Sequence, residues 1–557
     1  MDNISCGSHA VLMDSPRRRV EADNQIGPMT VGRVVLMRHL LHRARSHLRT
    51  IGFVQKAVAR VRTLGFDRQR IALERSRKLV ELGNCNAAAA VLEGIETKTR
   101  RAWKVLLTCY STVHRFEDVV SAYNTMPADL KDDYLCRYFY LAAAANLGQF
   151  ATVGGIIEDV LKEPSHPSGA EFLSRVRPFV EKLDPNLHQA VVRRIIAYSS
   201  QLAVDQFDTT LKCAHDLRER GQLTEALELA RALRRETRGA RNATKLAIFD
   251  AQVQFWEGRF DLQAAIVNDV LAKQKLDPIA LKDSSVPLIC DNLRTSTPVR
   301  SPVRGPLVSV LMPAYNSAGT IAYALESLRS QTYHDLEIIV VDDASQDETV
   351  QVIARACAVD PRIRFIPLSQ NSGPFVARNS ALAAATGEFV TNQDADDWAH
   401  PQKIATAIAE LQRDPSIIAT WVEHIRCSRE RGFRALNGYI RPDASSLMFR
   451  RRPVVETIGW YDSVRAAGDG EFHLRMERYY GRRSIRQLNK LLSFVNWSET
   501  TLSGGGVFRI DSDVNSYSPA RSSYRRSFSV WHETADHLYM SFPLAERPFP
   551  IPDSLLP

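Results

Sequence analysis

The sequence has few cysteines and no long apolar run. Its eight cysteines are scattered over 557 residues without a CxxC pair, so they indicate neither a disulfide framework nor a zinc site. No window reaches the roughly 18 consecutive apolar residues that a membrane span requires, and the polar first twenty residues lack the apolar core of a secretory signal. These absences favour a folded protein of the cytoplasm.

A second absence concerns nucleotide-binding fingerprints. The chain contains no GxGxxG pattern after a predicted strand, which argues against a dinucleotide-dependent oxidoreductase. The loop PAYNSAGT carries no basic residue, although the loop of a nucleotidyltransferase on a related α/β fold would be rich in glycine and contain Lys or Arg. Both classes of enzyme therefore lose support.

The charge is uneven along the chain. The formal net charge is +9, yet thirteen Arg or Lys residues against two acids lie between Arg33 and Lys78. This basic segment either contacts an anionic membrane surface peripherally or forms the first helices of a domain with a solvated basic face, and we favour the second interpretation. No recognisable nucleic-acid module accompanies the charge, so nucleic acid is not an expected partner.

The length of 557 residues predicts two to four domains, and residues 31–290 read as the first folded one, after a flexible N-terminus over residues 1–30. The stretch is rich in Ala, Leu, Arg and Glu with apolar residues at helical spacing. Similar helix-turn-helix joints recur about every 34 residues, with turns at Gly83, His114, Gly148, Gly221 and Gly258 and a weaker copy near 184–187. The pattern resembles tetratricopeptide repeats, which implies an all-α helical-repeat solenoid that binds a protein partner.

The hydrophobic pattern changes after a linker at residues 291–306, which is rich in Ser, Thr, Pro and Arg. Apolar runs and helical stretches then alternate, as in VSVLMPAYN, LEIIVVDD and DETVQVIARACAV. This order predicts an α/β domain with a parallel sheet over residues 307–500, followed by a C-terminal extension over 501–557. Because no catalytic constellation precedes residue 300, we expect a chain that begins near Pro302 to retain the chemistry.

Acidic residues follow the predicted strands. Asp342 and Asp343 end one apolar run, and Asp394, Asp396 and Asp397 follow another. Ligands of parallel α/β sheets bind at the carboxyl ends of strands, and clustered carboxylates favour a hard divalent cation that also binds diphosphate oxygens. A pair of acids after a strand is otherwise more often a helix cap or a turn.

From Val308 to about Gly481 the sequence resembles the family 2 glycosyltransferases of the GT-A fold. The matching elements are VSVLMPAYN, LRSQTYHDLEIIVVDDASQDET, NSGPFVARNSALAAATGEFVTNQDADDW and GWYDSVRAAGDGEFHLR. The resemblance implies that Tyr315 and Asp343 contact the nucleotide base and that Arg378 faces the nucleotide. It also implies a Mn²⁺ or Mg²⁺ site, with Asp396 as direct ligand and Asp394 near the ribose or the metal.

The resemblance assigns the catalytic base to Asp469, which would take the proton of the acceptor hydroxyl as this attacks the anomeric carbon with inversion. A helix N-cap is the alternative role of that residue. The family often has two adjacent acids here, whereas this chain has Gly468. Gly504 to Gly506 predict a hinge for a lid over the site, and His532 is a further candidate metal ligand.

These features predict a metal-dependent, inverting glycosyltransferase that moves a sugar from a nucleoside-diphosphate sugar, expected to be a UDP-sugar, to a carbohydrate acceptor in surface polysaccharide assembly. The alternative is a catalytically inactive scaffold that binds protein partners through its repeats. An inactive descendant of such an enzyme would have lost some of the acidic site residues, yet the acids implied by the resemblance are present. The expected location is the cytoplasm, with peripheral contact to the inner face of the membrane as an open alternative.

Overall fold

The computed structural model describes residues 68–557 apart from 82–84, 96–97, 164–166, 182, 199–206, 220, 237–238, 297–301, 436–437 and 512–515. Residues Ile71–Pro557 form one compact unit. The predicted flexible N-terminus, most of the basic segment and the turn at Gly83 lie outside the described residues. No helix in the described part of the chain is long and apolar enough to cross a membrane.

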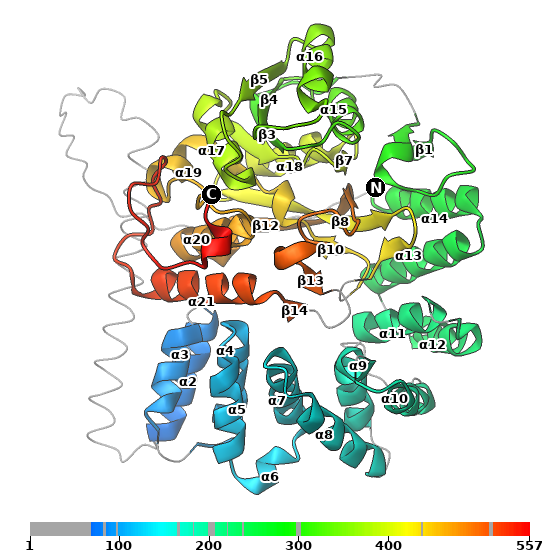
Figure 1. Cartoon of the computed structure of the whole chain (residues 1–557), viewed down its shortest axis with the longest axis vertical. Coiled ribbons are helices and arrows are strands. Elements are labelled where there is room, and N and C mark those ends of the chain that lie inside the picture. Colours follow the sequence, from blue (N-terminus) through cyan, green and yellow to red (C-terminus); the bar gives the residue numbers. More distant parts are fainter. Residues whose placement is uncertain are drawn as a thin grey trace, which may run out of the picture. The chain divides into compact units, whose positions relative to one another are not determined.

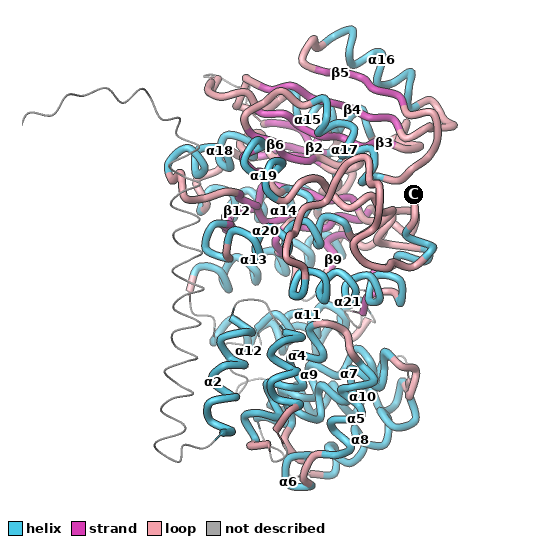
Figure 2. The backbone as a smooth tube through the Cα atoms, turned by 90° about the vertical axis from the view of Figure 1, so that its left-hand side faces the viewer, coloured by secondary structure: helices cyan, strands magenta, loops and turns pink. Residues whose placement is uncertain are grey.

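The first half of the described chain is helical, as expected, and its helices follow one another in pairs (Figures 1 and 2). The helices are α2 (Arg68–Glu81), α3 (Cys85–Glu93), α4 (Arg100–Thr112), α5 (Phe116–Thr125), α6 (Ala128–Lys131), α7 (Tyr134–Asn146), α8 (Phe150–Lys162), α9 (Pro167–Glu181), α10 (Pro185–Tyr198), α11 (Phe207–Glu219), α12 (Leu223–Glu236), α13 (Ala240–Trp256) and α14 (Phe260–Lys273).

The predicted turn positions end helices in the structure. His114, Gly148, Gly221 and Gly258 have φ values of 59°, 75°, 79° and 69°, a left-handed conformation that closes a helix and favours glycine. Small residues such as Ala88 on α3 are fully buried and let the neighbouring helix approach closely. The helix-turn-helix joints thus agree with the sequence, whereas their assembly into a repeat solenoid stays a prediction.

The helical stretch ends earlier than expected. After α14 the chain forms a small hairpin of β1 (Ile279–Leu281) and β2 (Leu293–Thr295), with the 3-10 helix η3 (Cys290–Asn292) before β2. The first residues of the predicted linker are therefore structured, and the thiol of Cys290 donates to the carbonyl of Phe494 at 3.2 Å. The domain boundary at residues 291–306 stays a prediction, although side-chain contacts run across it.

The second half carries the predicted α/β architecture. Its described strands form a ten-stranded sheet in the order β5-β4-β3-β6-β11-β8-β12-β7, with β9 and β10 paired to β8. The strands are β3 (Val308–Ala314), β4 (Leu336–Asp342), β5 (Ile363–Pro367), β6 (Phe389–Asn392), β7 (Trp398–Ala399), β8 (Ala419–Ser428), β9 (Gly432–Arg434), β10 (Arg441–Pro442), β11 (Met448–Arg450) and β12 (Ile485–Asn496). Neighbouring strands from β5 to β6 are parallel, and β11 pairs antiparallel with both β6 and β8.

The central strands are buried on both faces, as near-continuous apolar runs predict. Along β3, Val310 and Met312 join one hydrophobic core and Leu311 joins a second one. The helices of this half are α15 (Ile321–Arg329), α16 (Thr349–Val359), α17 (Pro374–Ala384), α18 (Lys403–Arg413), α19 (Arg451–Thr457), α20 (Gly468–Tyr480) and α21 (Pro519–Thr534). Short 3-10 helices are η4 (Ala444–Ser446), η5 (Arg482–Ser484), η6 (Gly506–Phe508) and η7 (Asp553–Leu555), and β13 (Ile510–Asp511) pairs with β14 (Ser516–Tyr517).

Candidate active site

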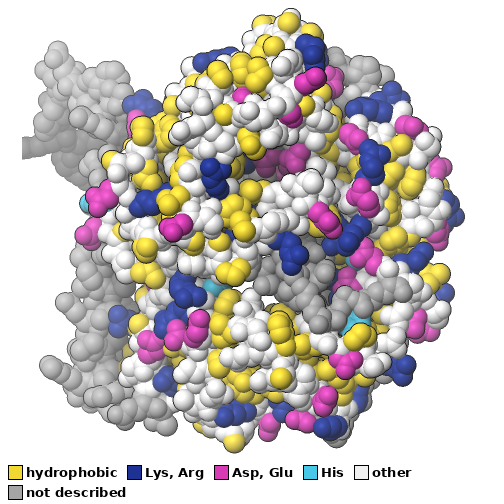
Figure 3. All heavy atoms as spheres, viewed as in Figure 1, with side chains coloured by type: hydrophobic (Ala, Val, Ile, Leu, Met, Phe, Trp, Pro, Cys, Tyr) yellow, Lys and Arg dark blue, Asp and Glu magenta, His cyan; other side chains and the backbone are white. Residues whose placement is uncertain are grey.

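The acidic residues singled out in the sequence meet at one edge of the sheet. Strands β4 and β6 lie on either side of β3 and run parallel to it, so their carboxyl ends are neighbours. A pocket of about 770 Å³ opens there. Acidic side chains are visible at a recessed position in the upper half of Figure 3. The pocket is lined by six of the predicted site residues, namely Tyr315, Asp343, Arg378, Asp394, Asp396 and Asp469.

Tyr315 and Asp343 follow the ends of adjacent strands. Tyr315 comes directly after β3 and is 47% exposed, so its ring is free to pack against a ligand. Asp343 is buried, and its two carboxylate oxygens accept the backbone N–H groups of Ser372 and Gly373, each at 2.7 Å. Burial raises the pKa of Asp343, which the two amide donors oppose. Asp343 therefore holds the loop that leads into α17 as well as lining the pocket.

Arg378 lies on α17 and is buried beside two of the acids. Its Nη2 donates to Oδ1 of Asp394, and its guanidinium stacks on the ring of Phe375 with 4.6 Å to the ring centroid. Burial acts to lower the pKa of Arg378, but Asp394 and Asp469 outweigh it and raise that pKa above its ordinary value. Arg378 thus partly neutralises the acidic wall and fixes the direction of Asp394.

The acids after β6 are crowded. Burial and, second, Asp394 raise the pKa of Asp396 to about 7. Oδ1 of Asp397 accepts the backbone N–H of Asn496 at 2.9 Å, and the hydroxyl of Tyr323 donates to the backbone carbonyl of Asp396 at 2.8 Å. Carboxylate oxygens that repel one another at such a position are hard ligands suited to Mn²⁺ or Mg²⁺, so these residues fit the predicted cation.

Asp469 belongs to the first turn of α20 and is not its cap. The N-cap is Ala467, whose φ of 67° is left-handed, and among the described residues Oδ1 of Asp469 accepts only the N–H of the adjacent Gly470, at 2.8 Å. The side chain is half-buried and lines the pocket. Helix capping, the alternative role considered for this residue, is therefore not what its side chain does here.

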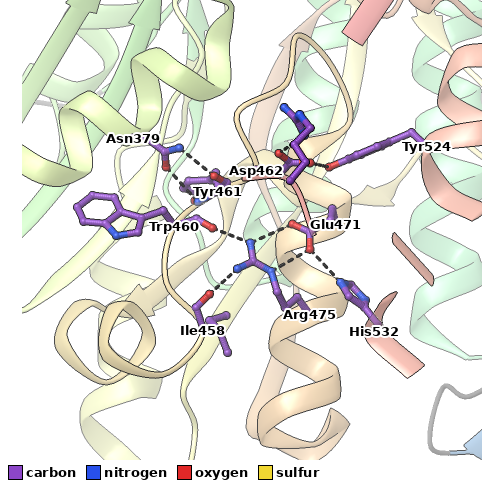
Figure 4. Close-up of polar contacts among 10 residues, drawn as sticks. Asn379, Ile458, Trp460, Tyr461, Asp462, Glu471, Arg475, Tyr524 and His532 are labelled. Atoms are coloured by element: carbon purple, nitrogen blue, oxygen red, sulfur yellow. Dashed lines mark hydrogen bonds and ion pairs between the residues drawn. The ribbon is translucent and has the colours of Figure 1, made fainter. Parts of the chain in front are cut away.

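His532 does not join the acidic cluster. It lies on α21, is buried, and its Nε2 contacts Oε1 of Glu471 at 2.9 Å (Figure 4). Glu471 forms a fully buried ion pair with Arg475, whose guanidinium also donates to the carbonyl of Trp460 at 2.6 Å. Since His532 is not among the pocket residues, its geometry corrects the metal-ligand interpretation and gives it a structural role between α20 and α21.

The predicted lid segment lines the pocket. Residues 500–503, with Phe508 and Ile510, form part of its wall. The glycines that follow are needed for close packing, because a Cβ at Gly504 would lie 1.9 Å from the carbonyl oxygen of Ser498. The stretch expected to be a hinge is therefore a tight turn in this structure.

Some pocket residues carried no signal in the sequence. Arg426 on β8 and Arg441 on β10 line the pocket, as do Asn371 and Arg465, which donates to Asn371 and to the backbone carbonyl of Leu556. An arginine in a strand has no local pattern that separates it from an ordinary surface arginine. Strand pairing is what brings these residues to the pocket.

Comparison with known proteins supports the interpretation of the α/β half. Residues 309–462 match the model of the family described as "Glycosyl transferase family 2". The chain is 30% identical over 209 residues to a chondroitin synthase of Escherichia coli. The aligned stretch covers 35% of this chain and 30% of that protein. It is 41% identical over 103 residues to the succinoglycan biosynthesis protein ExoO of Rhizobium meliloti, covering 18% of this chain and 29% of that protein.

The structural similarity is limited to part of the chain. The S. aureus TarS 1-349 structure in complex with UDP-GlcNAc has a TM-score of 0.32 at 21% identity, covering 42% of this chain and 68% of that one. The chain spans less than a third of the length of the curated relatives named above. Residues 309–462, which carry Asp343, Asp394 and Asp396, are thus similar to the family 2 glycosyltransferases, and Asp469 follows the matched residues.

Proposed function

We propose that the protein is an inverting glycosyltransferase that moves a sugar from a nucleoside-diphosphate sugar, expected to be a UDP-sugar, to a carbohydrate acceptor in surface polysaccharide assembly. The observation that carries this proposal is the convergence of Tyr315, Asp343, Asp394, Asp396 and Asp469 on one pocket at the strand ends. Relatives described as chondroitin synthase and succinoglycan biosynthesis protein are consistent with a polysaccharide product.

Tyr315, Asp343 and Asp469 have different roles in the proposed reaction. The exposed ring of Tyr315 stacks on the base, and Asp343 both lines that end of the pocket and holds the loop before α17. Asp469 accepts the proton of the acceptor hydroxyl as its oxygen attacks the anomeric carbon from the face opposite the leaving diphosphate. A half-buried carboxylate with a single hydrogen bond, from Gly470, has a lone pair left for this proton.

Asp396 and Asp394 are the residues that would hold a divalent cation. When bound, Mn²⁺ or Mg²⁺ would stabilise the negative charge that develops on the departing diphosphate. Arg378, which is buried, orients Asp394 through the hydrogen bond between them. Because Arg378 is already paired with Asp394, we assign it the role of positioning that acid. We do not assign it direct binding of the nucleotide.

The helical half is proposed to bind a protein partner, and the protein is proposed to act in the cytoplasm with a peripheral contact to the membrane. A convex or concave face of packed helices offers a large contact area without catalytic groups. The rival function, an inactive scaffold, is less well supported because the acids expected to be lost in a relic all line the pocket.

The proposal is tested by UDP release from a panel of UDP-sugars in the presence of Mn²⁺ or Mg²⁺. We expect one donor to be turned over, with activity abolished by EDTA and restored by the added cation. Asp396→Ala should remove this activity while leaving the thermal unfolding temperature close to that of the wild type. The matched control is Glu348→Ala, an exposed acid at the start of α16 that is not among the pocket residues. Full turnover in EDTA would exclude the cation site.

A further inference from the structure

The pocket has a basic wall besides its acidic one. Arg426 from β8, Arg441 from β10, and Arg521 and Arg525 from α21 all line the same cavity. The acidic wall is explained by the donor and its cation under the proposed function. The basic wall has no role in that account, and its positive charges need an explanation of their own.

Strand pairing brings two of these arginines together. Arg441 lies opposite His424 in the antiparallel pair of β10 and β8. Arg426 is two residues further along β8, so its side chain points to the same face of the sheet as that of His424. Like charges on neighbouring positions of one face repel each other and destabilise the pairing. This arrangement therefore destabilises the sheet.

The two guanidiniums have no counter-ion among the described residues. There, neither the side chain of Arg426 nor that of Arg441 forms a hydrogen bond or an ion pair, and Nε and Nη1 of Arg426 are buried without a partner. Burial and, second, Arg441 lower the pKa of Arg426 to about 10. Asp397 and Asp443 act in the opposite direction on this pKa, but within the described residues neither forms an ion pair with Arg426. Buried donors left without acceptors are costly unless a ligand satisfies them.

Other arginines of the pocket are satisfied internally. Arg378 is paired with Asp394, Arg465 donates to Asn371, Arg521 donates to the carbonyl of Phe508 at 2.7 Å, and Arg525 donates to that of Thr112 at 3.3 Å. Positive charge as such therefore does not distinguish Arg426 and Arg441 from these arginines. The difference is that, among the described residues, no oxygen accepts a hydrogen bond from their guanidiniums.

The position of the missing anion follows from the strand order. Tyr315 and Asp343, which are proposed to hold the nucleotide, follow β3 and β4, whereas β8 and β10 lie beyond β6 and β11 in the sheet. An anionic group that meets β8 and β10 in this pocket then belongs to the sugar acceptor. Guanidinium forks bind carboxylate and phosphate groups through two parallel hydrogen bonds, which is the geometry that a pair of arginines can offer.

We propose that Arg426 and Arg441 form an acceptor subsite for an anionic group, so that the acceptor is an acidic glycan carrying a carboxylate or a phosphate. This inference rests on the proposed function. It deepens that function by naming the chemical class of the acceptor. A uronic acid residue and a phosphodiester link are the two sources of such a group, and the experiment below separates them.

The test measures binding and transfer by the full chain with UDP-sugar and Mn²⁺. Three oligosaccharide probes of equal length serve as acceptors: one containing uronic acid, one linked by phosphodiesters and one neutral. We expect calorimetry to detect one of the anionic probes and not the neutral one. Arg426→Gln and Arg441→Gln should each weaken that binding about 10-fold or more, with the affinity for UDP-sugar unchanged. Arg429→Gln is the matched control, because this exposed arginine near the end of β8 lies outside the pocket and pairs with Asp291.

A structural role for the arginines predicts something different. Removing an uncompensated charge should leave the unfolding temperature equal or higher, whereas loss of a structural contact would lower it. The inference is overturned if both variants bind the anionic probes like the wild type, if no anionic probe binds better than the neutral one, or if the variants lose affinity for UDP-sugar instead. Failure of the wild type to release UDP from any UDP-sugar would refute the proposed function itself and is read in the same assay without acceptor.

Discussion

Gly468 stands immediately before the proposed base, at a position where the family resemblance predicts an acid. The structure gives a steric reason for the glycine, because a Cβ at this position would lie 2.8 Å from the ring of Phe375. That ring in turn supports the guanidinium of Arg378. A side chain at Gly468 would therefore displace a wall of the pocket next to Asp469.

This geometry yields a matched pair of substitutions. Gly468→Ala should lower turnover by about 10-fold or more, because ring displacement of even a fraction of an ångström disturbs the alignment of the reacting groups. Gly155→Ala on α8 is the control, since nothing lies within 4 Å of its added Cβ and Gly155 is not a pocket residue. Steady-state rates of the two variants with saturating donor are the measurement. Equal rates in both would show that Phe375 does not set the geometry of the site.

A second residue-scale prediction concerns Glu337 on β4. Burial acts to raise its pKa, but hydrogen bonds from Ser309, Thr386 and Arg364 outweigh this and hold the pKa of Glu337 at about 2. Because the folded-state pKa is depressed, the charged carboxylate stabilises the fold above its unfolded-state pKa. That contribution is lost as the pH falls from about 4.5 towards 2.

Glu337→Gln should therefore lower the free energy of unfolding near neutral pH, by about 1 to 3 kcal/mol for a buried group with charge-assisted hydrogen bonds. The difference from the wild type should shrink as the pH is lowered through this window. Denaturant unfolding at several pH values measures it, with Glu326→Gln on the exposed side of α15 as the control. A difference that stays constant from pH 7 to pH 3 would mean that the charge of Glu337 contributes nothing.

At the scale of elements, the helices before the predicted linker are tied to the sheet behind the pocket. The side chain of Gln252 on α13 accepts the backbone N–H of Phe433 at 2.5 Å and donates to the carbonyl of Arg431 at 2.8 Å. Gln274, just after α14, accepts the N–H of Leu491 at 2.7 Å. These contacts argue against the expectation that a chain beginning near Pro302 keeps the chemistry intact.

Two truncated chains separate these interpretations. A chain that begins at Gly239 keeps α13, α14 and the β1–β2 hairpin and should stay monomeric with cooperative unfolding. A chain that begins at Pro302 exposes the apolar surface beneath those elements and should aggregate or unfold at a clearly lower temperature. Size-exclusion chromatography and thermal unfolding of both chains provide the measurement. Equal unfolding temperatures would restore the sequence-based boundary.

Helix α21 is the element that joins the two halves near the site. Tyr524 and Phe528 on this helix line the pocket, while Arg526 donates to the carbonyl of His114 and Glu533 accepts the N–H groups of Asn86 and Ala87 at the start of α3 (Figure 1). No sequence pattern indicates these contacts, since residues more than 400 positions apart form them.

At the scale of the whole molecule, local patterns predicted the elements and the acidic wall well. Apolar runs ending in Asp343 or before Asp394 place carboxylates at strand ends, and parallel pairing with β3 makes those ends neighbours. What local patterns could not predict depends on long-range pairing. Arg378 lines the pocket as expected, but no local pattern indicated its pairing with Asp394, and His532, expected near the cation, contacts Glu471.

The account as a whole depends on Asp469 acting as a base in sugar transfer. General-base removal typically costs about 100- to 10,000-fold in rate, while donor binding relies on other residues of the pocket. The most direct measurement compares Asp469→Asn with the wild type by calorimetry with UDP-sugar and by turnover with saturating acceptor. We predict unchanged donor affinity, an unchanged unfolding temperature and turnover reduced at least 100-fold. Normal turnover in Asp469→Asn would contradict the account.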